Sequence, residues 1–168
     1  MDRLTPARRS WLMSRVRGKN TTPELRVRQT AHALGLRFRL HASDLPGTPD
    51  LIFPSRNLVV FVHGCYWHRH SACPKASPPS SPFWAAKFTS NVARDDRVQS
   101  ELRSLGWNVV VIWECETKKP ATLRAIISRR VKRRKVALRK VPPHRNVRIN
   151  PRTHKTPERS HTVGTHGK

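Results

Sequence analysis

The segment from His63 to Cys73 is the part of the sequence richest in groups that bind metal ions. It holds three histidines and two cysteines, and a third cysteine follows a distant apolar stretch. Thiolates and imidazoles at such spacing favour a tetrahedral Cys3His zinc site, whose ligands would be Cys65, His70, Cys73 and Cys115. The alternative is a set of buried thiols without a metal. His68 would stay free for chemistry, because it lies on the opposite side of an extended loop from its neighbours.

An acid and a histidine at the ends of neighbouring strands form a second candidate site. Asp50 follows a proline turn and opens a predicted strand, and His63 ends the next strand. If these strands pair as a hairpin, both side chains reach the same edge of the sheet. Because Mg2+ prefers carboxylate oxygen, this arrangement is typical of a magnesium-dependent nuclease. The alternative is that Asp50 only stabilises the turn.

Three large aromatic residues lie in polar, basic and proline-rich surroundings that are unusual for a core. They are Tyr66, Trp67 and Trp84. On a DNA-binding surface, such side chains can wedge between base pairs. The alternative is that they pack in the core or support the metal-binding loop.

The hydrophobic pattern predicts an α/β domain in which helices cover a mixed sheet. Unbroken apolar runs are typical of central strands buried on both faces, and shorter alternating runs between turns predict outer strands. The expected strands span residues 36–40, 50–53, 58–62 and 107–113. The expected helices span residues 22–34, 83–105 (a segment that allows one break) and 121–135. The sheet must therefore position the two candidate sites.

The chain carries 34 Lys and Arg against 10 Asp and Glu, a net charge of +24, which predicts a polyanionic partner such as nucleic acid. Residues 118–168 hold 17 of these bases, a single acid and no aromatic residue. Such a composition cannot bury enough surface to offset its ordering entropy. We therefore expect a folded domain over residues 1–134 and a basic, disordered tail over residues 135–168. The tail would either bind phosphates without reading sequence or simply be solvated.

Several classes of protein are excluded by the sequence. No apolar run approaches the roughly 18 residues of a membrane span, and the first residues lack the apolar stretch of a signal peptide. Three cysteines without a signal peptide also argue against a disulfide framework. We therefore expect a cytoplasmic protein that does not engage a membrane.

A specific motif is formed by His63-Gly64-Cys65-Tyr66-Trp67-His68-Arg69-His70 together with the distant Trp113-Glu114-Cys115. With this motif the chain resembles the very short patch repair (Vsr) DNA mismatch endonucleases. The resemblance covers roughly residues 10–117 and does not extend to the tail. The other matching stretches are residues 13–24, 45–50, Phe83-Trp84, Asn91, Arg94-Asp95 and Gly106-Trp107.

The resemblance implies a restriction-endonuclease-like fold, stapled by zinc, and a magnesium-dependent activity. Members nick one DNA strand at T:G mismatches, which arise when methylated cytosine deaminates within a methyltransferase's recognition site. This nick initiates very short patch repair. We accordingly expect a monomer that acts on double-stranded DNA at the nucleoid, alongside mismatch-repair proteins and a cognate cytosine methyltransferase.

The resemblance also implies a role for each candidate residue. Asp50 would bind magnesium together with the main-chain carbonyl of Val62, and His63 would lie near the scissile phosphate. His68, with Glu24 beside it, would handle the water or the leaving group, and a hydrogen bond between them would fix the imidazole tautomer. The structural zinc would be held by Cys65, His70, Cys73 and Cys115. The DNA wedge would consist of Tyr66, Trp67 and Trp84.

Other functions remain as alternatives. A restriction or general repair nuclease of the same fold would use the same residues. A non-catalytic, zinc-stapled DNA-binding module is disfavoured, because a pure binder has no use for Glu24 and Asp50 facing phosphate. A ribosomal-type basic protein would explain the tail, but neither the buried strands nor the Cys/His cluster.

Overall fold

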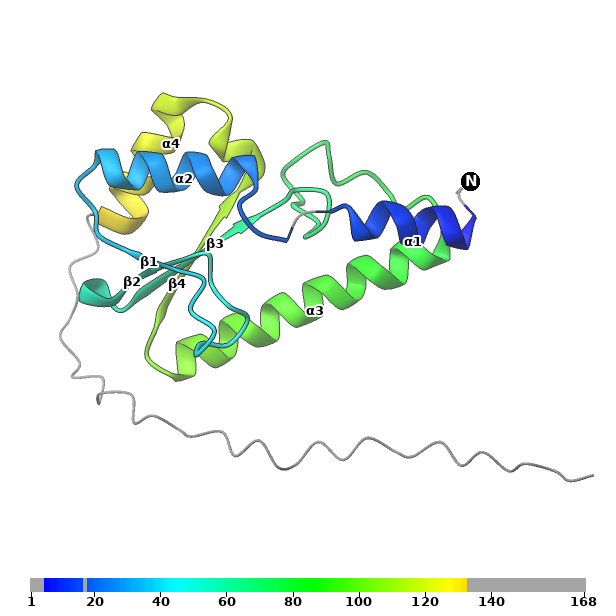
Figure 1. Cartoon of the computed structure of the whole chain (residues 1–168), viewed down its shortest axis with the longest axis horizontal. Coiled ribbons are helices and arrows are strands. Elements are labelled where there is room, and N and C mark those ends of the chain that lie inside the picture. The colour runs from blue at the N-terminus through cyan, green and yellow to red at the C-terminus, as the bar shows by residue number, and fades with distance from the viewer. Residues whose placement is uncertain (1–4, 17, 133–168) are drawn as a thin grey trace, which may run out of the picture. The chain divides into compact units, whose positions relative to one another are not determined.

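A four-stranded mixed sheet lies at the centre of the computed structural model, which describes residues 5–16 and 18–132 (Figure 1). The strands are β1 (Arg39–Leu40), β2 (Leu51–Phe53), β3 (Leu58–His63) and β4 (Asn108–Trp113), in the spatial order β1-β2-β3-β4. The pairs β1–β2 and β2–β3 are antiparallel, whereas β3 and β4 are parallel. The expected α/β class with a mixed sheet is therefore confirmed.

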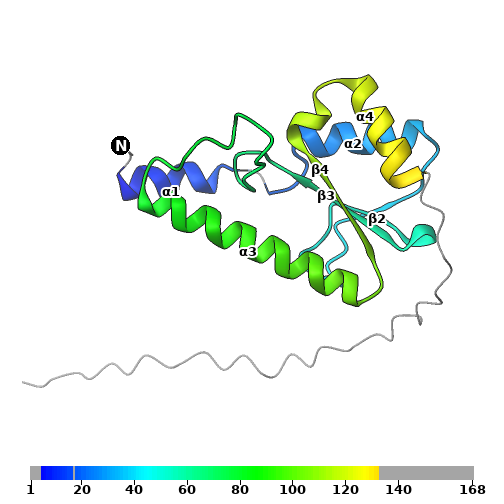
Figure 2. The same cartoon turned by 180° about the vertical axis from the view of Figure 1, so that it is seen from behind.

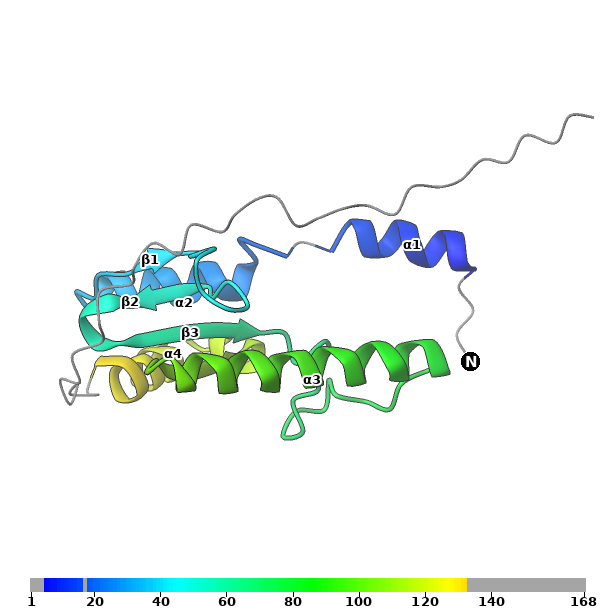
Figure 3. The same cartoon turned by 90° about the horizontal axis from the view of Figure 1, so that it is seen from below.

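Helices cover both faces of this sheet. They are α2 (Thr22–Ala33), α3 (Pro82–Ser104) and α4 (Pro120–Ile127), whereas α1 (Pro6–Ser14) lies away from the sheet (Figure 1). Short helical turns span Pro54–Arg56, Glu114–Thr117 and Ser128–Lys132. Figures 1 and 2 show α2 and α4 together on one face and α3 on the other. Figure 3 shows that the N-terminal half of α3 extends past the end of β3. Helix α3 can thus place side chains beside the residues that follow β3.

Alternation along β3 explains why its sequence is apolar without interruption. Leu58 and Val60 belong to the core cluster shared with α2 and α4, and Val59 and Phe61 belong to the cluster shared with α3. Successive strand residues point to opposite faces, so a strand covered on both sides needs an apolar residue at every position. The interpretation of residues 58–62 as a buried central strand is confirmed.

The N-terminal helix α1 was not predicted from the sequence. Its start carries a recognisable signal, because Thr5 caps it by accepting a hydrogen bond from the Arg8 amide (3.3 Å) and Pro6 occupies the first turn. None of its residues is buried, so it contributes nothing to the core.

The boundaries of other elements also differ from expectation. The first strand is shorter than residues 36–40, α3 is continuous rather than broken, and α4 ends at Ile127 before a wider helical turn to Lys132. The expected disordered tail, residues 135–168, lies outside the described residues. No helix within the described part of the chain is long and apolar enough to cross a membrane.

Gly47 provides a test of the turn that leads into β2. Its φ of +68° favours glycine, and a Cβ there would meet Val98 Cγ1 of α3 at 2.4 Å. Gly35 is the matched control, because its φ is +74° but a Cβ would meet nothing within 4 Å. Gly35→Ala should therefore cost only the left-handed backbone strain, about 1–2 kcal/mol.

Gly47→Ala should destabilise the protein by a further 1–3 kcal/mol or so, because it adds a steric clash to the same backbone strain. Denaturant unfolding of both variants measures the difference. Adding Val98→Ala to Gly47→Ala should recover part of the loss. Equal destabilisation by the two glycine substitutions would contradict the close approach of the turn to α3.

Candidate functional site

A cavity of about 1010 Å³ opens where β3 ends, between the start of α2 and the middle of α3. All five residues of the predicted active site line it: Glu24, Asp50, Val62, His63 and His68. Trp67 also lines the cavity, as do Asn91, Arg94 and Asp95 of α3. The structure therefore brings together residues that lie up to 71 positions apart in the chain, from Glu24 to Asp95.

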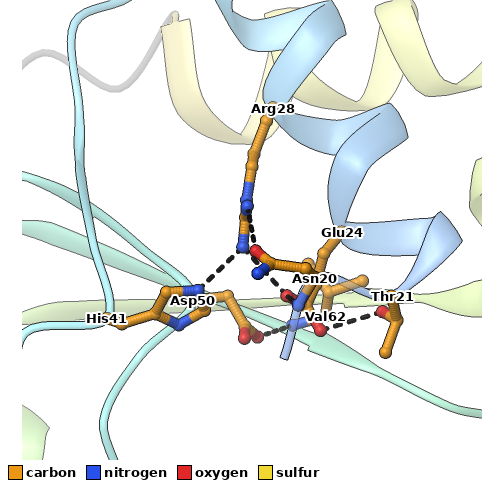
Figure 4. A network of polar contacts seen from close by, with 7 residues as sticks. All are labelled: Asn20, Thr21, Glu24, Arg28, His41, Asp50 and Val62. Atoms are coloured by element: carbon orange, nitrogen blue, oxygen red, sulfur yellow. Dashed lines mark hydrogen bonds and ion pairs between the residues drawn. The ribbon is translucent and has the colours of Figure 1, made fainter. Parts of the chain in front are cut away.

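Asp50 lies beside the main chain of Val62. The Val62 amide donates a hydrogen bond to Asp50 Oδ2 at 2.7 Å (Figure 4). In the β2–β3 register Leu51 pairs with Val60, and continuing it by two residues places Pro49 opposite Val62. Proline has no N–H, so Pro49 cannot donate a hydrogen bond to the Val62 carbonyl. The N–H and C=O of one strand residue point to the same side of the strand. The Val62 carbonyl therefore faces the side on which Asp50 lies.

The charge of Asp50 is unfavourable in the protein without a bound cation. Burial, with a smaller contribution from the nearby Glu24 carboxylate, raises the pKa of this carboxyl to about 6, against the lowering effects of the Val62 hydrogen bond and of Arg28 and His68. A cation at this position would relieve that cost, which is the electrostatic signature of a metal-binding carboxylate.

Glu24 does not pair with His68, so that expectation was wrong. Its Oε2 accepts hydrogen bonds from the Asn20 amide (2.9 Å) and from Arg28 Nη2 (3.0 Å), and its Oε1 accepts one from Thr21 Oγ1 (2.8 Å) (Figure 4). Asn20 and Thr21 directly precede α2, and Arg28 lies one helical turn after Glu24. The buried carboxylate is therefore bonded to residues of its own segment. Only 3% of Glu24 is exposed.

The partner of His68 is Asp95 of α3. His68 Nδ1 forms a short hydrogen bond to Asp95 Oδ2. Burial disfavours the Asp95 carboxylate, but the hydrogen bond and charge of His68 outweigh it and lower the pKa of Asp95. Asp95 lies near the middle of α3, beside the loop after β3, and so reaches the loop histidine, whereas Glu24 is held by residues at the start of α2.

His63 packs against His68 as a neutral ring. The two ring centroids lie 3.9 Å apart and the rings are nearly parallel, with an interplanar angle of 14°. Burial and the neighbouring His68 lower the pKa of His63 to about 4. One nitrogen or carboxylate oxygen from each of His63, His68 and Asp95 lies within 4.8 Å of the others. The lone pairs of imidazole lie in the plane of the ring, so two stacked rings direct them side by side rather than towards one point. His63, His68 and Asp95 are therefore better arranged for proton transfer than for binding a metal ion.

The four predicted zinc ligands form a compact cluster. One ligand atom from each of Cys65, His70, Cys73 and Cys115 lies within 4.8 Å of all the others. His70 Nδ1 is 3.7 Å from Cys65 Sγ and 3.4 Å from Cys115 Sγ. Ligands around tetrahedral zinc lie about 3.5–3.8 Å apart, given its bond lengths. Without a cation, burial raises the pKa of the Cys65 thiol to about 12.

Strand register explains how distant ligands meet. His63 pairs with Trp113 at the end of the parallel β3–β4 ladder, and Cys65 and Cys115 each follow two residues later. The Cys115 amide donates to Cys65 Sγ at 3.4 Å, and the ring of His70 stacks on Trp113 at 4.2 Å. The loop after β3 is thereby fixed to the end of β4.

The three predicted wedge residues also lie together. Trp67 contacts Tyr66 and Trp84, with ring centroids 5.1 and 6.0 Å away, and all three lie against Phe88 of α3. Trp84 is buried, with 8% exposed, whereas Tyr66 and Trp67 are half-buried. Asn91 Nδ2 donates a hydrogen bond to the Trp67 carbonyl at 3.1 Å, which ties this loop to α3.

Comparison with known proteins identifies the family. The family model "DNA mismatch endonuclease Vsr" matches residues 1–74. The Type II nicking enzyme V.XorIIP of Xanthomonas oryzae is 52% identical over 126 residues, which cover 74% of this chain and 92% of that protein. The chain belongs to the Vsr family. It is therefore a DNA endonuclease, a hydrolase of the phosphodiester backbone.

A further relative supports membership of the Vsr family. The DNA mismatch endonuclease Vsr of Escherichia coli is 38% identical over 110 residues, covering 65% of this chain and 70% of that protein. Among solved structures, the Homing Endonuclease I-Bth0305I Catalytic Domain gives a TM-score of 0.46 at 24% identity, over 65% of this chain and 92% of that chain. The latter similarity is too low to support any statement about the site.

Three polar residues of this Vsr-family site were given no role from the sequence. Asp95 and Asn91 lie in matched motifs, but nothing in the sequence indicates which loop atoms they meet. Arg28 carries a local signal, because it follows Glu24 by four residues on one helix, the spacing of a helical ion pair. That spacing could have revealed the partner of Glu24.

Proposed function

We propose that this Vsr-family endonuclease nicks one DNA strand at T:G mismatches, in a magnesium-dependent reaction that initiates very short patch repair. The observation that carries the proposal is the single cavity lined by Asp50 and Val62 on one side and by His68 and Asp95 on the other. A phosphate placed there would meet a cation site and a proton-transfer pair together. We also assign the sheet to the restriction-endonuclease-like fold.

The residues around Asp50 fit a magnesium ion. Oδ2 of Asp50 accepts the Val62 amide bond, which leaves Oδ1 and the Val62 carbonyl as oxygen donors on the same side. Magnesium bound there would neutralise charge on the phosphate and lower the pKa of water.

His68 is assigned the proton transfer. An ionised carboxylate only accepts hydrogen bonds, so the pair with Asp95 puts the proton on Nδ1 and leaves the lone pair on Nε2. Nε2 can then take a proton from water or return it to the leaving oxygen. Asp95 stabilises the imidazolium that forms, as the acid does in a catalytic triad. His63, held neutral, would donate a hydrogen bond to a phosphate oxygen.

The Cys/His cluster fits a structural zinc ion. Three thiols and one imidazole offer the donor set of a closed tetrahedral site, and burial makes the thiolate of Cys65 costly without a cation. Zinc would hold the loop that carries Tyr66, Trp67 and His68 against the end of β4. The same ion would therefore support both the wedge and the proton-transfer pair.

Selectivity for the mismatch would come from the aromatic wedge. A T:G wobble pair stacks less well than a matched pair, so inserting side chains beside it costs less. Half-buried Tyr66 and Trp67 would enter the duplex, and buried Trp84 would brace them from behind. Asn91 would fix the loop that carries them.

The remaining assignments follow from charge and from the family. Residues 1–134 would form the endonuclease domain and residues 135–168 a basic tail that adds phosphate contacts without sequence preference. We propose a monomer acting in the cytoplasm at the nucleoid, with mismatch-repair proteins and a cytosine methyltransferase as functional partners. A second candidate, nicking of a matched recognition site as in a restriction enzyme, is favoured by the name of the Xanthomonas relative, a Type II nicking enzyme.

Asp50→Asn tests the proposed function. Wild type should nick the T strand of T:G duplexes with magnesium, and should leave matched C:G duplexes of the same sequence intact. Asp50→Asn keeps an acceptor for the Val62 amide but loses the charge, so nicking should fall at least about 100-fold. The control is Asp44→Asn, at an exposed acid in the loop before β2. Equal nicking of matched duplexes would favour the restriction-type alternative, and magnesium-independent nicking would refute the metal site.

Asp95→Asn tests the proton-transfer pair. The neutral amide cannot stabilise the imidazolium, and its NH2 group can donate to His68 Nδ1 and so favour the wrong tautomer, so kcat should fall roughly 100-fold or more. Asp96→Asn is the matched control, since that acid is the next residue of α3 and is exposed. Its single-turnover nicking rate should stay within about twofold of wild type. Similar rates for the two variants would remove Asp95 from the reaction.

Elemental analysis tests the zinc site. The purified protein should contain about one zinc per chain, and Cys115→Ser should lose both the zinc and cooperative thermal unfolding. His68→Gln changes a histidine of the same loop outside the cluster, and it should keep the zinc. A metal-free protein that still unfolds cooperatively would contradict the assignment.

Trp67→Ala tests the wedge. Each stacked aromatic is typically worth about 1–3 kcal/mol, so affinity for T:G duplexes should fall about 5- to 150-fold, and affinity for T:A duplexes should hardly change. Trp84→Ala is the comparison, because loss of a buried ring should lower the melting temperature and weaken all duplexes alike. Fluorescence anisotropy with both duplexes, together with thermal melting, separates the cases. Equal losses on T:G and T:A for Trp67→Ala would exclude the wedge.

A further inference from the structure

Arg28 joins three segments around the candidate active site. From the middle of α2 its Nη1 donates to Asn20 Oδ1 at 2.6 Å, and its Nη2 contacts Glu24 Oε2 at 3.0 Å and His41 Nε2 at 2.8 Å (Figure 4). Asn20 precedes α2, and His41 follows β1. Only 12% of the Arg28 side chain is exposed. One planar guanidinium therefore holds three acceptors that come from different parts of the chain.

His41 accepts a hydrogen bond in this arrangement. A guanidinium has donors and no acceptor, so His41 Nε2 must offer its lone pair and the proton must sit on Nδ1. His41 also has a φ of +47°, a left-handed conformation that is uncommon outside glycine. Arg28 thus fixes the start of the loop that leads through Gly47 and Pro49 to Asp50.

The bonds to Glu24 leave little freedom for its carboxylate. A carboxylate offers about four lone-pair sites. Two bonds reach Oε2, from the Asn20 amide and Arg28, and one bond from Thr21 reaches Oε1. The group can therefore accept about one further hydrogen bond, at Oε1. Glu24 and Asp50 line the same cavity.

We propose that Arg28 is a positioning residue for the nicking reaction. Its fork orients Glu24 so that Oε1 accepts a hydrogen bond from a water beside Asp50, and its bond to His41 fixes the loop that carries Asp50. Its positive charge also offsets two carboxylates, Glu24 and Asp50, that line one cavity. This inference rests on the proposed nicking function, in which Asp50 holds the metal ion, and it adds Glu24 and Arg28 to the residues that serve that reaction.

A double-mutant cycle tests whether Arg28 acts through Glu24. Glu24→Gln and Arg28→Gln should each lower kcat at least 10-fold, with the KM for T:G duplex within about twofold of wild type. The double variant should lose much less than the product of the two single losses, because only the contact with His41 is then left for Arg28 to act through. Arg26→Gln, a change at an exposed arginine of the same helix, is the control and should keep kcat within about twofold.

The outcomes separate the two proposals. Wild-type kcat for Glu24→Gln would overturn this inference but leave the nicking function in place, since Asp50→Asn tests that function separately. Impaired Glu24→Gln together with wild-type kcat for Arg28→Gln would overturn only the role of Arg28. Multiplied losses in the double variant would also overturn it, since they would mean that Arg28 acts independently of Glu24.

Conservative variants test the geometry of the fork. Arg28→Lys keeps the charge but presents one nitrogen, so kcat should stay at least about fivefold below wild type.

His41→Gln retains an acceptor and should keep kcat within about twofold of wild type, whereas kcat of His41→Leu should fall about three- to tenfold. Thermal melting of the metal-free protein gives a readout besides activity. His41→Leu should lower the melting temperature when it is made in the wild-type protein. It should have no such effect when it is made in the Arg28→Gln variant, where the bond between Arg28 and His41 is already lost. Full rescue by Arg28→Lys, or equal behaviour of the two His41 variants, would refute the fork.

Discussion

The parallel pairing of β3 with β4 is the constraint on which the rest of the structure depends. Its register aligns His63 with Trp113 at one end of the sheet, so the chain leaves both strands at the same edge. Cys65 and Cys115 follow directly, and their cluster with His70 and Cys73 closes the loop that carries Tyr66, Trp67 and His68. A shift of register by one residue would turn the β3 side chains to the opposite faces and separate these groups.

The cavity beside this edge concentrates charge that folding alone would not favour. Asp50, Glu24 and Asp95 are all at least partly buried, and each is held by a specific donor: the Val62 amide, Arg28 and His68. The same burial that raises the pKa of Asp50 favours a bound cation, which is the compromise between stability and function expected at an active site. The positive charge of the whole chain then serves a different purpose, attraction of the polyanionic substrate.

Much of this arrangement could be predicted from short patterns in the sequence. The apolar runs of β3 and β4, the grouping of Asp50 with His63 and the four residues of the Cys/His cluster each depend on strand periodicity or on donor type. The partner of His68 could not be predicted in this way, because it depends on which part of α3 lies beside the loop after β3. Helix α1 was missed, although Thr5 and Pro6 mark its start. Arg28 forms a local pair that spacing reveals, but its contact with His41 depends on tertiary structure.

The most direct test of the central claim is the location of the catalytic cation. Crystals of the protein with a T:G duplex, grown with Mn2+ in place of Mg2+, would give an anomalous signal at the ion, which takes oxygen ligands as magnesium does. The account predicts a peak within about 2.5 Å of an Asp50 carboxylate oxygen and of the Val62 carbonyl. A peak among His63, His68 and Asp95, with none beside Asp50, would contradict it.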